Sequence, residues 1–142
     1  MTFFSPLRAT ALAVALAATA FAASADTVTL KQVTSAQTGA EFVALGATEL
    51  SAAQFRQRVL DKPMTDVTDK WTWIINSDGT SQSAAKDGSW ATDNPWRMKG
   101  NLYCRTNEGK ENCSKTYAIG AYLRFSKASD TDELATWTAK VD

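Results

Sequence analysis

Five side chains in the second half of the sequence have the chemistry of a binding surface: Trp96, Tyr103, Arg105, Tyr122 and Arg124. Trp96 follows Asn94-Pro95 in an expected loop. The other four form two aromatic–arginine pairs at every second position, opposite apolar residues, so each pair is expected on one face of a strand. Aromatic faces and guanidinium groups together bind sugars, anionic ligands or protein partners. The alternative is an ordinary amphipathic surface, because arginine stems often cover aromatic faces without a ligand.

The two cysteines of the chain, Cys104 and Cys113, are expected to form a disulfide. The residues between them, 105–112, are polar and contain Asn107 and Gly109, which indicates the loop of a β-hairpin. A bridge across this hairpin closes a ring of about ten residues and stabilises the fold by roughly 2.7 kcal/mol in the chain-entropy model. Because a redox-active pair more typically has the spacing Cys-x-x-Cys, we interpret this pair as structural.

The composition excludes several common kinds of active site. The chain has no histidine, which removes Ser-His-Asp triads, Cys-His pairs and histidine-ligated metals. A bridged cysteine pair offers no thiolate, and the seven glycines are too widely spaced for a dinucleotide fingerprint or a phosphate loop. We therefore expect no catalytic residue, no cofactor and no metal site, and we do not expect an enzyme.

Acidic residues are the remaining candidates for catalysis or metal binding. Asp130, Asp132 and Glu133 carry the oxygen ligands that calcium prefers, but their spacing is not that of an EF-hand, and a solvated acidic loop explains them as well. Asp66 and Asp69 flank an expected strand and have the same alternative interpretation. Nothing in the sequence places two carboxylates across a cleft, as a glycoside hydrolase needs.

The first 25 residues predict a secretory signal peptide. Arg8 supplies a positive start, residues 9–20 are small and apolar, and Ala23-Ser24-Ala25 fits the cleavage pattern. The mature protein is then expected to be residues 26–142, a single β-rich domain in the periplasm or outside the cell, where disulfides form. No later segment is apolar enough to span a bilayer, and no cysteine lies near the cleavage site, so no membrane anchor is expected.

The balance of charges argues against a nucleic-acid partner. The chain has fifteen bases and fifteen acids, and loss of Arg8 with the signal peptide leaves one acid in excess. A nucleic-acid binder normally has a basic excess, and binding to anionic lipid needs a polybasic segment. We expect a monomer whose partner is a small ligand or an envelope protein.

One short helix is the clearest local feature of the sequence. Ser51 and Gln54 form a capping box, Leu50 and Phe55 fit a hydrophobic staple, and helical spacing continues to residue 60 or 61, before Pro63. A helix this short must dock its apolar stripe on the rest of the domain. Before it, residues 27–33 are expected to form a first strand, and residues 41–45 fit either a strand or a helical turn.

The remainder of the chain reads as short strands separated by turns such as Asp78-Gly79 and Asp87-Gly88. Asp93-Asn94-Pro95 is expected to interrupt the chain, and Trp71, Trp73 and Trp137 are expected to face the core. The expected strands are 70–76, 80–85, 101–105, 115–119, 121–126 and 135–141. The pattern predicts a mainly β (α+β) fold, an antiparallel meander of about six to eight strands in a curved sheet or partly open small barrel, with the helix over an opening or the concave face.

The pattern from Gly88 onward also resembles a group of known proteins. Gly88-x-Trp90 is followed by Gly100-x-x-Tyr103-Cys104-Arg105, then by Cys113 and by Leu123-Arg124-Phe125. This order is similar to that of small exported proteins of alphaproteobacteria, and the resemblance implies a disulfide-bonded β domain without an assigned activity. Such chains are sometimes labelled dihydrodipicolinate reductase, a label that does not fit here because the phosphate-binding turn of a nicotinamide enzyme is missing.

Two hypotheses about function follow from these observations. The first is a non-enzymatic binding module for a small ligand or an envelope glycan, because five tryptophans are present on an expected β scaffold. The alternative is a protein-interaction role, such as inhibition of a lysozyme-type hydrolase of the cell envelope, because a small disulfide-bonded domain presents a rigid surface for docking.

Overall fold

The computed structural model describes residues 28–128 and 135–142, and this part of the chain is mainly β. Its helices are α1 (Leu30–Ser35), α2 (Gly39–Ala44) and α3 (Ala52–Arg58). Its strands are β1 (Thr48–Glu49), β2 (Met64–Asp66), β3 (Trp71–Ile75), β4 (Thr80–Ala85), β5 (Ala91–Lys99), β6 (Leu102–Asn107), β7 (Lys110–Ile119), β8 (Tyr122–Lys127) and β9 (Ala135–Val141).

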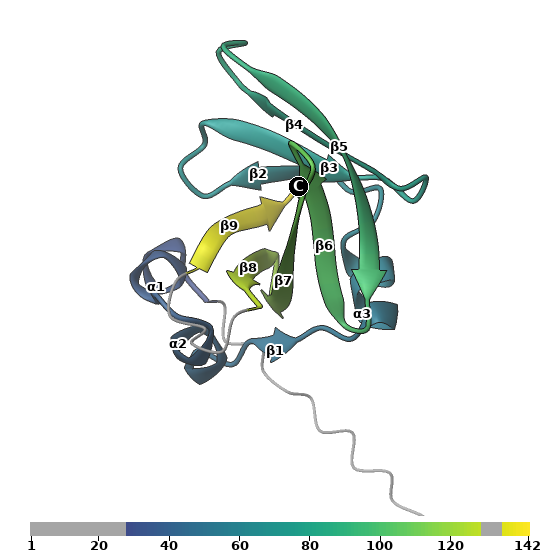
Figure 1. Ribbon diagram of the computed structural model, residues 1–142. Coiled ribbons are helices and arrows are strands. Elements are labelled where there is room, and N and C mark those ends of the chain that lie inside the picture. Colours follow the sequence, from purple (N-terminus) through teal and green to yellow (C-terminus); the bar gives the residue numbers. More distant parts are fainter. Residues whose placement is uncertain (1–27, 129–134) are drawn as a thin grey trace, which may run out of the picture.

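The strands close into a barrel (Figure 1). Around the ring the order is β7-β6-β5-β4-β3-β2-β9-β8, every pair is antiparallel, and β8 returns to β7. Strand β1 adds two residues to β7 and is not part of the ring. The predicted antiparallel barrel is confirmed, and it is closed rather than partly open. Closure leaves no unpaired edge in the ring.

The β6–β7 hairpin shows how the sequence sets the register of the barrel. Glu108 and Gly109 both have positive φ, 48° and 76°, which a two-residue type I′ turn requires. This turn pairs Asn107 with Lys110 and, further along the two strands, sets Cys104 opposite Cys113. The two cysteines form the predicted disulfide.

The N-terminal segment differs from the sequence prediction. Residues 30–35 form helix α1 rather than a strand, because Thr29 and Gln32 make a capping box. Residues 39–44 form helix α2, one of the two structures that the sequence left open, and Thr38 and Glu41 make a second capping box there. Both helices are short and depend on the barrel surface for their stability.

Strand β5 continues through Asp93-Asn94-Pro95, where an interruption was predicted. Pro95 pairs with Thr80, the first residue of β4, and the pairing of β5 with β6 begins only at Trp96. Pro95 therefore lies where β5 changes its main partner. Its missing N–H interrupts neither ladder, which is the kind of position where a strand tolerates proline.

The helices cover two different parts of the barrel (Figure 1). Helices α1 and α2 lie against its outer face beside β8 and β9, where Val33, Phe42 and Tyr117 belong to one apolar cluster. Helix α3 lies at the end of the barrel formed by the β3–β4, β5–β6 and β7–β8 turns. There the Ala52 N–H donates to Asn101 Oδ1 at 3.0 Å, and Arg58 donates to the Gly120 carbonyl at 2.9 Å.

Helix α3 is the helix that the sequence predicted, and it closes one end of the barrel. Ser51 and Gln54 make the expected capping box, and Phe55 and Val59 enter the main core together with Leu50. Fully burying an aromatic side chain such as Phe55 contributes about 2–3 kcal/mol. Because α3 fills this end of the barrel, a ligand could enter the interior only from the opposite end.

Candidate functional site

A column of stacked aromatic rings fills the barrel from helix α3 toward the opposite end. Phe55 stacks on Tyr103 with ring centroids 5.5 Å apart, and it meets Phe125 edge-on at 6.5 Å. Trp137 then stacks on Phe125 at 3.9 Å, with the two rings nearly parallel. Trp71 follows at 5.9 Å from Trp137, in an edge-on arrangement. The interior is therefore packed, and a ligand has access only where the column reaches solvent.

The column ends in a hollow at the barrel end opposite helix α3, which no described helix covers; we call this hollow the mouth. The hollow has a volume of about 260 Å³. Its lining residues are Trp71, Trp73, Ser83, Trp90, Thr92, Asn94, Arg105, Asn107 and Trp137. The mouth thus combines four indole rings with hydroxyl, amide and guanidinium groups, the mixture of an apolar wall and a few polar groups that is typical of small-ligand sites.

Of the described residues that line the mouth, Arg105 is the only one with a charged side chain. It projects from β6, where it pairs with Trp96 of β5 and Asn112 of β7. Among the described residues its side chain forms no hydrogen bond and no ion pair. Because no described carboxylate pairs with this half-buried guanidinium, its five donors are available for an anionic or strongly polar ligand.

The indole N–H groups divide into two sets. Trp73 donates to Ser81 at 2.7 Å, and Trp96 donates to the Asn76 carbonyl at 2.8 Å. Trp71, Trp90 and Trp137 make no such bond within residues 28–128 and 135–142. The donors of the second set all lie at the mouth, so the rings there provide both stacking faces and free N–H donors.

The five residues predicted as one binding surface do not come together, because barrel closure sends them to opposite faces. Tyr103 and Arg105 face the interior. Trp96 lies in strand β5 rather than in a loop, and it packs near helix α3 with its ring 6.0 Å from Phe55. Tyr122 and Arg124 face outward, beneath the N-terminal helices. Of the five, only Arg105 lines the mouth.

The expected exposure was wrong for Tyr103 and Arg124, which are 2% and 3% exposed. Arg124 is covered by helices α1 and α2, which the sequence analysis had placed differently. Its guanidinium donates to the Val33 carbonyl at 2.9 Å and to the Ala36 carbonyl, and it lies over the Phe42 ring. Both residues hold the fold together rather than presenting a surface.

Tyr103 is held in its neutral form. Burial raises the pKa of Tyr103 to about 12, against a hydrogen bond to Ser81 and the Arg105 charge, which act in the opposite direction. The hydroxyl donates to Ser81 Oγ at 3.0 Å. A phenol of this kind does not exchange a proton near neutral pH, so its role is structural.

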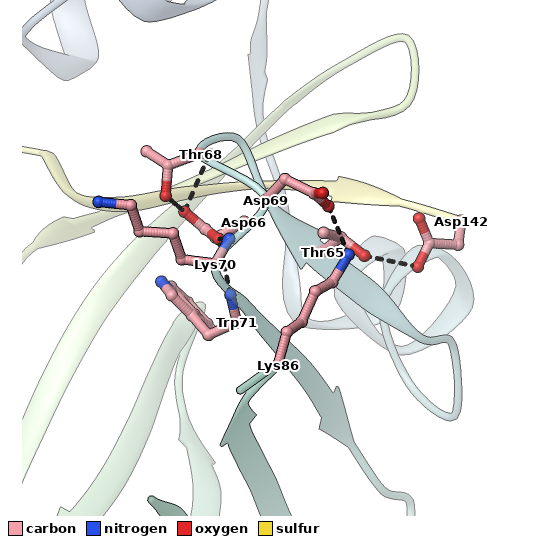
Figure 2. Close-up of polar contacts among 8 residues, drawn as sticks. All are labelled: Thr65, Asp66, Thr68, Asp69, Lys70, Trp71, Lys86 and Asp142. Atoms are coloured by element: carbon pink, nitrogen blue, oxygen red, sulfur yellow. Dashed lines mark hydrogen bonds and ion pairs between the residues drawn. The ribbon is translucent and has the colours of Figure 1, made fainter. Parts of the chain in front are cut away.

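The carboxylates of Asp66 and Asp69 are engaged in structural contacts (Figure 2). Asp66 accepts hydrogen bonds from the backbone N–H groups of Thr68, Lys70 and Trp71 at 2.8–3.0 Å and caps the turn before β3. Asp69 forms an ion pair with Lys86. The solvated interpretation fits Asp69, which is exposed, but not Asp66, which is buried as a turn cap. Asp130, Asp132 and Glu133 lie outside the described residues.

One further group has metal-ligating side chains close together, namely Cys104, Cys113 and Glu111. Both sulfur atoms belong to the disulfide, so neither is a thiolate ligand. Glu111 accepts two hydrogen bonds from Arg97, at 2.6 and 3.0 Å. The chemistry of this donor set does not fit a metal ion.

Trp71, Trp90 and Trp137 line the mouth, which was not predicted from the sequence. Trp71 and Trp137 alternate with polar residues, and this pattern indicates the correct face of the sheet. It does not give the position along the barrel axis: Trp71 begins β3 and Trp137 lies near the start of β9. An interior residue at the open end of a strand is accessible to a ligand.

No protein-family model matches this sequence, and comparisons with curated proteins and with solved structures also give no match. The resemblance drawn from the sequence stays a prediction. Among the described residues, no helix has the length and apolar character needed to cross a membrane. The disulfide is compatible with an oxidising compartment.

Proposed function

We propose that this protein is a non-enzymatic binding module that holds a small ligand at the mouth of its barrel. One observation carries the proposal: Arg105 has no partner among the described residues and lies among four tryptophans in a hollow of about 260 Å³. A cation in such a position is expected to bind a carboxylate or phosphate group, with the tryptophan faces against a ring of the same ligand.

The size of the mouth favours a ligand of one ring. Sites for drug-sized ligands usually have volumes of roughly 300–1,000 Å³, so this hollow is at the small end. Sugar rings suit it well, because their C–H faces pack on indole rings while Asn94, Asn107 and Thr92 offer groups for their hydroxyls. An acidic monosaccharide combines both features.

The proposal of binding without catalysis rests on the chemistry of the available groups. The chain has no histidine, Tyr103 is held neutral by burial, and the carboxylate of Asp66 is used as a turn cap. The mouth itself offers amide, hydroxyl, indole and guanidinium groups. These groups bind and orient ligands but transfer protons poorly at neutral pH.

The test is a ligand screen with matched charge variants. Purified oxidised protein is titrated with galacturonic acid, glucuronic acid and glucose, using tryptophan fluorescence and thermal shift. Binding stabilises the fold by roughly 2.7 kcal/mol when the ligand is present at one hundred times Kd. Arg105→Gln is expected to weaken binding of the acids about tenfold or more.

The control for this screen is Arg56→Gln, which removes the same charge from the exposed face of helix α3, at the sealed end of the barrel. It is expected to bind the acidic sugars as the wild type does. Equal affinity of wild type and Arg105→Gln, or a complete absence of binding to all three sugars, would contradict the proposal.

A protein-interaction role is the second candidate, and one observation favours it. Trp90 is 43% exposed at the rim of the mouth, and tryptophan and arginine are enriched at the energetic centres of protein interfaces. Inhibition of a lysozyme-type hydrolase of the envelope belongs to this class. Purified protein added to a lysozyme assay, with Trp90→Ala as its control, tests it. Unchanged hydrolysis at a large excess of this protein would rule out inhibition of lysozyme.

We further propose that the protein is exported after removal of residues 1–25. The Ala-rich start, the cleavage pattern at Ala23-Ser24-Ala25 and the disulfide support this. Mass spectrometry of the protein recovered from an expressing bacterium is expected to give a chain that starts at Asp26 and has no free thiol. A chain with an intact start and two free thiols would contradict export.

A further inference from the structure

The mouth lies between two further hollows. On one side a hollow of about 620 Å³ lies along the β4–β5 turn, and it shares Trp71 and Trp90 with the mouth. On the other side a hollow of about 600 Å³ lies along the β6–β7 hairpin, and it shares Arg105, Asn107 and Trp137 with the mouth. The three hollows have lining residues in common and so lie next to one another; together we call them the groove.

The hairpin end of this groove is positively charged. Arg105 and Lys127 line it, and neither has an ion-pair partner among the described residues. Lys99 lines it too and acts electrostatically on Glu111. Among the described residues, Glu111 is the only carboxylate in this lining, and Arg97 holds it through two hydrogen bonds. The charges of the described residues in this lining therefore favour an anionic ligand.

The opposite end of the groove is close to neutral. Asp69 and Lys86 form an ion pair there, and Trp71 and Trp90 supply ring faces. Amide groups recur along the groove, from Asn94 in the mouth to Asn112 on the hairpin. An occupant thus meets aromatic faces and hydrogen-bonding groups throughout. Within the described part of the chain, cations outnumber carboxylates only on the hairpin side, because Asp69 and Asp87 balance Lys70 and Lys86 at the other end.

We propose that the groove binds an acidic oligosaccharide, with one sugar ring in the mouth and at least one more along the β6–β7 hairpin. This inference rests on the proposed function and names its ligand class. Repeated rings suit a groove made of adjoining hollows with tryptophan faces, and carboxylates on successive rings would meet Arg105 and Lys127. Single-stranded nucleic acid has related chemistry, but the sequence pI of about 6.3 argues against it.

The test compares chain length, charge and class of polymer with the full oxidised protein. The compounds are galacturonic acid, trigalacturonic acid, a hyaluronan tetrasaccharide, neutral maltotriose and a short oligothymidylate, measured by calorimetry. At least one acidic oligosaccharide is expected to bind about tenfold or more tighter than the acidic monosaccharide. Maltotriose and oligothymidylate are expected to bind more weakly than both oligosaccharides.

Lys127→Gln distinguishes binding of an oligosaccharide along the groove from binding of a single sugar in the mouth. It is expected to weaken the oligosaccharide about two- to fivefold, as for an exposed ion pair, and to leave monosaccharide binding unchanged. Lys31→Gln, on exposed helix α1 away from the groove, is the matched control and is expected to change neither.

The outcomes that overturn the inference are distinct from those that overturn the function. Equal affinity for acidic monosaccharide and oligosaccharides overturns the groove and leaves the mouth site intact. If maltotriose or oligothymidylate binds more tightly than the acidic oligosaccharides, the assigned ligand class is wrong. If neither the acidic sugar nor the acidic oligosaccharides bind, the proposed function fails together with the inference.

Discussion

Replacing Arg124 is expected to detach the N-terminal helices from the barrel. Its guanidinium makes three close contacts: Nη2 with the Val33 carbonyl at 2.9 Å, Nε with Thr138 Oγ1 at 3.0 Å, and Nη1 with the Ala36 carbonyl. It also lies 4.5 Å from the centre of the Phe42 ring. The carbonyls of Val33 and Ala36 lie at the end of helix α1, where backbone acceptors lack helical partners.

The magnitude follows from these contacts. A hydrogen bond from a charged donor contributes about 1.5–3 kcal/mol, but the contributions are not additive, and burying the charge offsets part of them. Burial indeed lowers the pKa of Arg124 from its usual range, with the Glu41 charge acting the other way. We expect Arg124→Ala to lower the free energy of unfolding by about 3 kcal/mol.

The assay is urea unfolding followed by tryptophan fluorescence, combined with amide hydrogen exchange. Protection should fall mainly in helices α1 and α2. The control is Arg97→Ala, which breaks an exposed ion pair with Glu111 and is expected to change stability little. A loss below about 1 kcal/mol for Arg124→Ala, or unchanged protection of α1 and α2, would refute the reasoning.

Three further predictions concern the fold that supports the mouth. Phe55→Ala is expected to cost about 3–5 kcal/mol in urea unfolding because it opens a cavity behind the aromatic column; a loss below about 1 kcal/mol would mean that α3 does not plug the barrel. Replacing Cys104 and Cys113 together by serine should cost roughly 2.7 kcal/mol without changing the far-ultraviolet circular dichroism spectrum. Asp66→Asn should reduce the loss of unfolding free energy that occurs as the pH falls into the acid range. Burial acts to raise the pKa of Asp66, but the hydrogen bonds donated by Thr68, Trp71 and Lys70 outweigh it and lower the pKa. This carboxylate therefore stabilises the fold above its unfolded pKa of about 3.9, and the contribution is lost as pH falls through the folded value. Parallel wild-type and variant curves of urea midpoint against pH would contradict that role.

Much of the fold was predictable because its determinants are local. The Ser51 capping box marked α3, and turn residues marked most of the strands. The same kind of pattern was present at Thr29 with Gln32 and at Thr38 with Glu41, and it would have predicted both N-terminal helices. The β-branched residues around α1 favoured a strand instead, and contact with the barrel surface outweighed that preference.

The candidate site was less predictable because it depends on closure of the barrel. Alternation gives the face of a strand but not which face becomes the interior, so Tyr103 and Arg124 were both expected at the surface. Nor does alternation tell which end of the barrel a helix seals. Arg105 could be named from the sequence, whereas its neighbours Trp71 and Trp137 needed the assembled barrel.

The most direct test of the mouth as a binding site is an NMR titration of the five tryptophan indole N–H signals with trigalacturonic acid. The indole groups of Trp71, Trp90 and Trp137 have no protein acceptor among the described residues and line the mouth, so their signals should shift together and saturate. Trp96 donates to the Asn76 carbonyl near the sealed end, and its signal should stay in place. Shifts confined to Trp96, or no shift at any mouth tryptophan, would contradict the account.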